Sequence, residues 1–207
     1  MSNCIIASPE PWPPAFTAEG AHATLVPLTQ AHRDDLAEAS AEGDLHRTWY
    51  TTVPAPEAVA AEIDRRLGLR ERGSMLPFAI LRNVDGRAVG MTTYMNIDAP
   101  NRRVEIGSTW HRKSVQRTPI NTECKLMLLT RAFETLSCIA VELRTHAMNF
   151  QSRSAIERLG AKLDGVLRAH MVMPNGTLRD TAVYSITAAE WPAVRANLQW
   201  RLERPRD

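Results

Sequence analysis

The feature that most constrains the fold is a change of pattern in the middle of the chain. A strand-like segment, 104–110, passes through a short basic turn into a helix-like segment, 119–136. Thr118 is a favourable N-cap residue, and Pro119 suits the first helical position, where its missing N–H costs nothing. The chain is therefore predicted to place a strand, a tight turn and a helix start next to one another.

The turn itself is predicted to bind an anion. The first N–H groups of a helix have no partner inside it, and they lie at the positive end of the helix dipole. The predicted donors and the nearby cations are the amides of Ile120, Asn121 and Thr122 and the side chains of Arg112 and Arg117. On this local pattern we expect a phosphorylated ligand, with a helix start that binds nothing as an equal alternative.

The rest of the chain alternates strand and helix patterns. Residues 1–20 contain four prolines and are expected to form an irregular arm, held by Trp12 and Phe16, while 21–207 are expected to form a single domain. Strands are predicted at 23–28, 76–82, 88–97, 104–110, 139–144, 164–173 and 178–187. Helices are predicted at 29–40, 55–70, 119–136, 152–159 and from about 191. This order predicts an α/β or α+β fold.

Two sequence motifs add a family resemblance. One is Asn149-x-x-Ser152, which opens the helix that ends at Leu159-Gly160, and the other is the turn 116–121. With the element order, they resemble the GNAT superfamily of N-acetyltransferases, and within it the branch of the ribosomal-protein-alanine acetyltransferases. The resemblance runs from about residue 24 to residue 190. It implies a central, mostly antiparallel mixed sheet flanked by helices, with a splayed strand pair at the acetyl-CoA site.

The resemblance also implies an activity. GNAT enzymes move an acetyl group directly from acetyl-CoA to a primary amine in a ternary complex. The acceptor would be a protein or peptide N-terminal amine, or a small-molecule amine. In the family the turn reads Arg/Gln-x-x-Gly-x-Gly/Ala, and its amides hold the pyrophosphate of acetyl-CoA. The residues assigned to acetyl-CoA by this resemblance are Ser108, Trp110, Gln116, Arg117, Thr118, Pro119, Ile120, Asn121, Thr122 and Asn149.

The turn departs from the family at both glycine positions. Pro119 cannot donate a hydrogen bond, and Asn121 has a side chain where the backbone should approach a phosphate closely. The alternative is therefore that the chain is a catalytically weak or inactive GNAT-fold module with an acyl-CoA-binding or regulatory role.

Two residues are candidates for proton transfer. Glu105, on the strand before the turn, is the candidate base, with a surface glutamate paired to Arg102 or Arg103 as the alternative. Ser152 matches the family position that protonates the leaving thiolate, with a helix N-cap as the alternative. His146 ranks below Ser152 as an acid.

The acceptor side is predicted from the resemblance and from aromatic residues. The loop between the first two helices borders the acceptor cleft in this fold, so Trp49 and Tyr50 are candidate substrate contacts, with core packing as the alternative. Thr93 and Tyr94, on the strand beside Glu105, are also candidates.

Composition limits the remaining possibilities. A net charge of +2 is too small to indicate bulk nucleic-acid binding, and no apolar run approaches the length of a membrane span. The cysteines, Cys4, Cys124 and Cys138, show no metal spacing and indicate reduced thiols in a cytoplasmic protein. No metal site is expected, and a homodimer is possible by resemblance.

Overall fold

The computed structural model describes residues 11–204. Its strands are β1 Ala18–Glu19, β2 Ala23–Pro27, β3 Met75–Arg82, β4 Ala88–Asp98, β5 Arg103–His111, β6 Ala140–His146, β7 Lys162–Val172 and β8 Leu178–Thr187. Its α-helices are α1 Arg33–Ala41, α2 Val59–Glu71, α3 Pro119–Thr130, α4 Phe150–Leu159 and α5 Trp191–Glu203.

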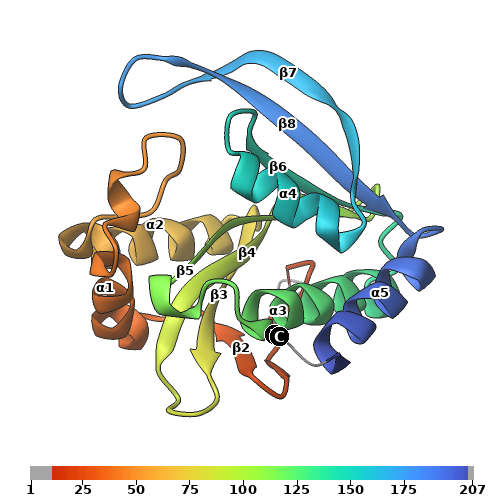
Figure 1. Ribbon diagram of the computed structural model, residues 1–207, viewed down its shortest axis with the longest axis horizontal. Helices are drawn as coiled ribbons and strands as arrows, with labels where there is room; N and C mark the ends of the chain where they lie inside the picture. The colour runs from red at the N-terminus through yellow and green to blue at the C-terminus, as the bar shows by residue number, and fades with distance from the viewer. Residues whose placement is uncertain (1–10, 205–207) are drawn as a thin grey trace, which may run out of the picture.

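The eight strands form one sheet in the order β1-β2-β3-β4-β5-β6-β8-β7. Every neighbouring pair is antiparallel except β5 and β6, which are parallel and are joined by the crossover through α3. Helices α1 and α2 cover one face of the sheet, while α3 and α5 cover the other (Figure 1). The predicted mixed, mostly antiparallel sheet flanked by helices is confirmed.

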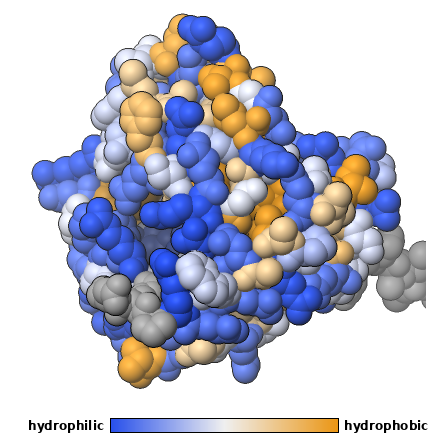
Figure 2. Space-filling view, turned by 45° about the vertical axis from the view of Figure 1, so that its right-hand side comes forward, coloured by the Kyte–Doolittle hydropathy of each residue, from blue (hydrophilic) through white to orange (hydrophobic). Residues whose placement is uncertain are grey.

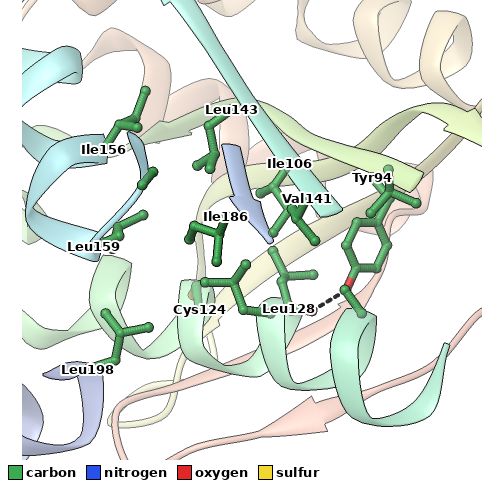
Figure 3. Close-up of a cluster of buried hydrophobic side chains, with 14 of the residues drawn as sticks. Tyr94, Ile106, Cys124, Leu128, Val141, Leu143, Ile156, Leu159, Ile186 and Leu198 are labelled. Atoms are coloured by element: carbon green, nitrogen blue, oxygen red, sulfur yellow. Dashed lines mark hydrogen bonds between the residues drawn. The ribbon is translucent and has the colours of Figure 1, made fainter. Parts of the chain in front are cut away.

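The core has a part on each face, because the strands alternate apolar side chains between two covered faces. On the α3 and α5 face, Leu128 packs among residues from β4, β5, β6 and β8 (Figure 3). Residues of α1 and α2 such as Leu36 and Ile63 pack with Met91 and Trp110 on the opposite face. A helix on each face fixes the positions of β4 and β5 between them.

The N-terminal arm is more ordered than predicted at its end. Residues 1–10 lie outside the described residues, but Ala18–Glu19 pairs with β2 as a short strand. Trp12 and Phe16 pack against the core, as the sequence predicted, and the Phe16 and Phe78 ring centroids are 4.9 Å apart.

The helix predicted at 119–136 changes character before its end. The α-helix stops at Thr130, and residues Arg131–Thr135 form a π-helical turn. The hydroxyl of Tyr94 donates a hydrogen bond to the carbonyl of Leu128 near this point (Figure 3). The C-terminal helix begins at Trp191, where Pro192 suggested it would, and Gly160 ends α4 with φ 104°, the predicted left-handed cap.

The β7–β8 hairpin arches over one end of the molecule (Figure 1). Apolar side chains are exposed at this end (Figure 2), and those that belong to the hairpin are Leu163, Val166, Leu167, Met171, Val172 and Leu178.

Candidate active site

The two parallel strands separate after only three residue pairs. Arg103 to Glu105 pair with Ala140 to Glu142, and beyond that point the remainder of β5 pairs with β4 alone. The predicted splayed strand pair is therefore present. One backbone edge of β5, from Ile106 to His111, is left free of a strand partner, and it can hydrogen-bond an extended ligand.

A bulge shapes the free edge of β5. The pairing with β4 shifts register here, and Ser108 adopts the left-handed conformation with φ 47°. Arg66, fully buried on α2, donates to the carbonyl of Ser108 at 3.2 Å and to the Thr93 hydroxyl at 2.9 Å. The bulge is thus held in place from the α2 side of the sheet.

Sequence reasoning missed Arg66, although a pattern existed that could have identified it. It lies on the apolar stripe of α2, three residues after Ile63, and Glu62 stands four residues before it. The structure pairs Arg66 Nε with Glu62 Oε1 at 2.7 Å. A charged residue at a buried helical position with its counter-ion one turn away indicates a paired, buried polar contact.

The turn before α3 has the predicted geometry but not the predicted cap. Thr118 is extended, with φ −95° and ψ 174°, and Pro119 is the first helical residue. The Thr118 hydroxyl donates to the carbonyl of Val115 at 2.6 Å and so does not cap the helix. Arg117 adopts φ 62°, the conformation that a glycine would take most easily.

Two backbone donors therefore remain at the helix start. Because Thr118 is the N-cap, its carbonyl accepts the first intrahelical hydrogen bond from the amide of Thr122. The amides of Ile120 and Asn121 keep no helical partner and have no side-chain cap. The expectation that the Thr122 amide points at a ligand is wrong for this reason.

One of the two predicted cations near the turn is less available than expected. Arg112 does not supply mobile charge, because it forms ion pairs with Glu38, at 2.7 Å, and with Glu42. Gln116 donates through Nε2 to the carbonyl of His111 at 3.2 Å, which braces the turn against the end of β5.

A buried lysine lies between α3 and β5. Lys125 is 6% exposed, and its Nζ donates to the hydroxyl of Thr109 at 3.0 Å. No carboxylate among residues 11–204 forms an ion pair with it, and burial lowers the pKa of its ammonium to about 8. No sequence pattern marked this residue as buried.

Glu105 is a buried carboxylate and not the surface glutamate of the alternative. It is 5% exposed, accepts from Asn96 Nδ2 at 2.6 Å, and lies 3.5 Å from Arg144 Nε. Arg103 pairs instead with Glu142, at 2.6 Å. Burial raises the pKa of the Glu105 carboxyl, against the opposing effects of the Asn96 hydrogen bond and the Arg144 charge.

The Asn-x-x-Ser motif opens α4 differently from the sequence expectation. The N-cap is Asn149, whose Oδ1 accepts from the Ser152 amide at 3.0 Å. Ser152 stands in the first turn of the helix, so the N-cap alternative for Ser152 is wrong. This leaves its hydroxyl without a capping role.

The loop before α2 brings aromatic rings to the end of β6. The ring of His146 lies edge-on to Trp49, with centroids 5.2 Å apart, and to Tyr50, at 6.4 Å. Thr93 and Tyr94 do not join this group, because both are fully buried and Tyr94 bonds to α3 on the other face of the sheet. The structure thus brings together two of the four predicted acceptor residues.

Three further observations concern covalent catalysis, metal binding and membrane insertion. Cys124 is a core residue, and burial raises the pKa of its thiol to about 12, which makes it a poor nucleophile. Within the described part of the chain, no group of three or more His, Cys, Asp or Glu side chains is placed to hold a metal ion. No helix of residues 11–204 has the length and apolar character to cross a membrane.

Comparison with known proteins gives a family match. Residues 22–162 match the model described as an acetyltransferase (GNAT) domain. A curated protein of Bacillus subtilis (strain 168), named "Putative ribosomal N-acetyltransferase YdaF", is 35% identical over 107 residues, or 52% of this chain and 57% of that protein. The chain thus spans little more than half the length of this relative.

Solved structures are similar over nearly the whole chain. A GCN5-related N-acetyltransferase from Brucella melitensis superposes with a TM-score of 0.84 at 33% identity, covering 95% of this chain and 90% of that one. Mycobacterium smegmatis RimJ, solved in complex with CoA-disulfide, has a TM-score of 0.72 at 23% identity, covering 86% and 88%. At that identity the second likeness supports the fold alone.

Proposed function

Because the chain belongs to the acetyltransferase (GNAT) family, we propose that it transfers an acetyl group directly from acetyl-CoA to a primary amine. The observation that carries this proposal is the splay of β5 and β6 beside an uncapped helix start. An open strand edge and free helix amides together match a ligand with an amide-bearing arm and a pyrophosphate.

The residues present fit acetyl-CoA. The amides of Ile120 and Asn121 would hold the pyrophosphate, and the β5 backbone at Ser108 and Trp110 would pair with the amides of the pantetheine arm. Asn149, at the start of α4, would border that arm. Acetyl-CoA supplies a thioester-activated acetyl group, and the protein holds the acceptor amine close to it.

Glu105 is the proposed base for the acceptor amine. A peptide α-amine has a pKa of about 8, so roughly a tenth of it is neutral at pH 7 and a weak base suffices. Burial moves the pKa of Glu105 upward, toward the range in which a carboxylate accepts a proton efficiently. Ser152, with its hydroxyl outside the helix cap, is the proposed proton donor to the leaving thiolate.

The proposed acceptor is the N-terminal amine of a protein. Its support is the naming of YdaF as a ribosomal N-acetyltransferase. A small-molecule amine is the second acceptor class. The inactive-module alternative is not favoured for two reasons. The altered turn still offers two amides without a helical partner, and the candidate base Glu105 is a buried carboxylate.

Two measurements test the proposal. Acetyl-CoA should raise the thermal unfolding temperature, because a ligand that binds only the native state stabilises it. Release of free CoA should then be measured over a panel of amines that includes N-terminal peptides. Absence of binding at millimolar acetyl-CoA would overturn the proposal, and binding without release on any amine would favour the inactive module.

A further inference from the structure

His146, the last residue of β6, has a donor that nothing in the described chain uses. The side chain is 4% exposed, and its Nδ1 accepts a hydrogen bond from the amide of Met148 at 3.1 Å. In the neutral ring the proton must therefore sit on Nε2. Nε2 is buried and has no hydrogen-bond partner among residues 11–204.

The surroundings of the ring favour its neutral form. Burial and the charge of Arg179 lower the pKa of His146, while Asp180 acts in the opposite direction. Thr181, the β8 residue that pairs with His146, accepts a hydrogen bond from Arg179 Nε and hydrogen-bonds to His170, so its hydroxyl is occupied elsewhere. At neutral pH the free Nε2–H is thus a donor and cannot accept a proton.

A buried N–H group without an acceptor is costly, and native proteins rarely keep one. This one lies among the rings of Trp49 and Tyr50, which belong to the loop that borders the proposed acceptor site, and Trp49 is 46% exposed. The group therefore lies beside a partly exposed residue of this loop. A donor in an aromatic setting suits a neutral oxygen better than a carboxylate, since burying a charge there costs more.

We propose that His146 Nε2–H donates a hydrogen bond to the carbonyl oxygen adjacent to the reacting amine of the acceptor. The inference rests on the proposed function and narrows its substrate class. The site then selects amines that carry a neighbouring carbonyl, as the first residue of a peptide does, over simple alkylamines. His146 is a specificity-determining residue in this account and does not move a proton.

A matched pair of variants separates this role from a structural one. In His146→Asn the amide oxygen can replace Nδ1 and keep the bond to Met148, but the distal donor is lost. In His146→Gln the amide nitrogen can reach the position of Nε2, but the Nδ1 acceptor is lost. The acceptors are alaninamide and 2-aminopropane, which share the branched carbon and differ in a carboxamide in place of one methyl group.

The readout is kcat/KM for each amine at saturating acetyl-CoA, relative to wild type with the same amine, so that differences in amine basicity cancel. His146→Asn should lower the value for alaninamide about 10–100-fold, mainly through KM, and leave that for 2-aminopropane nearly unchanged. His146→Gln should retain most of the preference for alaninamide.

Other outcomes overturn the inference. An equal loss with both amines in His146→Asn would indicate proton transfer or a packing role, and no loss with either would show that the donor is unused. If His146→Gln does not fold, the comparison of the two amines in His146→Asn still tests the inference. Wild type that binds acetyl-CoA, with no selective loss for alaninamide in His146→Asn, refutes only this inference, whereas failure of wild type to bind acetyl-CoA refutes the proposed function.

Discussion

Three buried charged side chains surround the bulge of β5, and each is stabilised differently. Arg66 has an ion pair with Glu62 and two further hydrogen bonds. Glu105 has an amide donor from Asn96 and the nearby charge of Arg144. Among residues 11–204, Lys125 has only the hydroxyl of Thr109 as a side-chain hydrogen-bond partner. Because an unpaired buried charge is costly, Lys125 is the least favourable of the three for folding.

Replacing Lys125 should therefore stabilise the protein. Its pKa falls from 10.5 to about 8 on folding, so below pH 8 both states are protonated and the folded state bears the full cost. The Lys125→Met variant should gain about 1–3 kcal/mol in free energy of unfolding at pH 7.

The gain should depend on pH in a defined direction. Between about pH 8 and 10.5 the unfolded wild type binds more protons than the folded one, so wild-type stability rises with pH and the advantage of the variant shrinks. Urea titrations at pH 7 and pH 10 measure this, with the exposed Lys113→Met as control. A gain of equal size at both pH values would contradict the account.

Gly107 sets the position of the Glu105 carboxylate. A Cβ atom at residue 107 would lie 2.7 Å from Glu105 Oε1 and 2.8 Å from Met95 Sδ. Gly107→Ala should push the carboxylate away and reduce turnover at pH 7 by about 10–100-fold, with recovery at higher pH where the amine loses its proton unaided. Acetyl-CoA affinity should change little.

Gly165→Ala is the matched control for that variant, because nothing lies within 4 Å of its added Cβ. Steady-state rates from pH 6.5 to 9.5 give the comparison. If Gly107→Ala has the pH profile and the turnover of wild type, Glu105 does not act as the base.

At this scale the sequence made Glu105 a candidate base, with a surface glutamate paired to Arg102 or Arg103 as the alternative, and that alternative is wrong. Arg102 and Arg103 are adjacent in sequence, whereas Arg144 reaches Glu105 only because the crossover places β6 beside β5. Arg66 and Lys125 escaped notice for a related reason. Burial of a charged residue depends on which helix face meets the sheet, and the partners come from distant strands.

At the scale of elements, the start of α3 was predicted accurately. Thr118 and Pro119 fix it locally, since a proline ring presets φ and the N-cap must be extended. The end of the same helix was not predicted, because the π turn involves no special residue in the sequence. The hairpins of β3–β4 and β7–β8 also follow from local turn residues, such as Gly86 and Gly176 with positive φ.

The first helical residue gives a prediction at this scale. Pro119→Gly should lower the free energy of unfolding by about 0.4–1 kcal/mol, because glycine frees the unfolded chain. It also adds a third amide donor beside those of Ile120 and Asn121. Acetyl-CoA should bind the folded variant at least as tightly as wild type. Titration calorimetry measures the affinity, and thermal unfolding measures the stability. A variant that is more stable and does not bind would contradict the role given to this turn.

At the scale of the whole molecule, one carboxylate ties the N-terminal strands to α3. Glu123 accepts from the amides of Ala21, at 2.6 Å, and of His22 and Ala23, both at 2.8 Å. Glu123→Gln keeps the shape but turns an amide group toward those donors, so it should cost about 2–3 kcal/mol. Chemical denaturation beside the exposed control Glu19→Gln measures the difference. A loss no greater than that of the control would mean that the contact contributes little.

The arrangement of the sheet was predicted only through the family resemblance. Alternating patterns locate strands, but they do not show which strands pair or where a pairing stops. The β5–β6 ladder ends three residues before Ser108, the bulge residue whose carbonyl accepts from Arg66, and no local pattern encodes this long-range contact.

The short ladder between β5 and β6 has a consequence for how the backbone exchanges protons with solvent. Alternate amides of Ile106–His111 turn toward the splay and not toward β4, so they lack a strand acceptor in the middle of an eight-stranded sheet. In deuterated water these amides should exchange quickly while their neighbours on the same strand are protected. A molecule bound in the splay would slow hydrogen exchange of these amides alone. Their exchange rates would therefore measure binding at this site without a label.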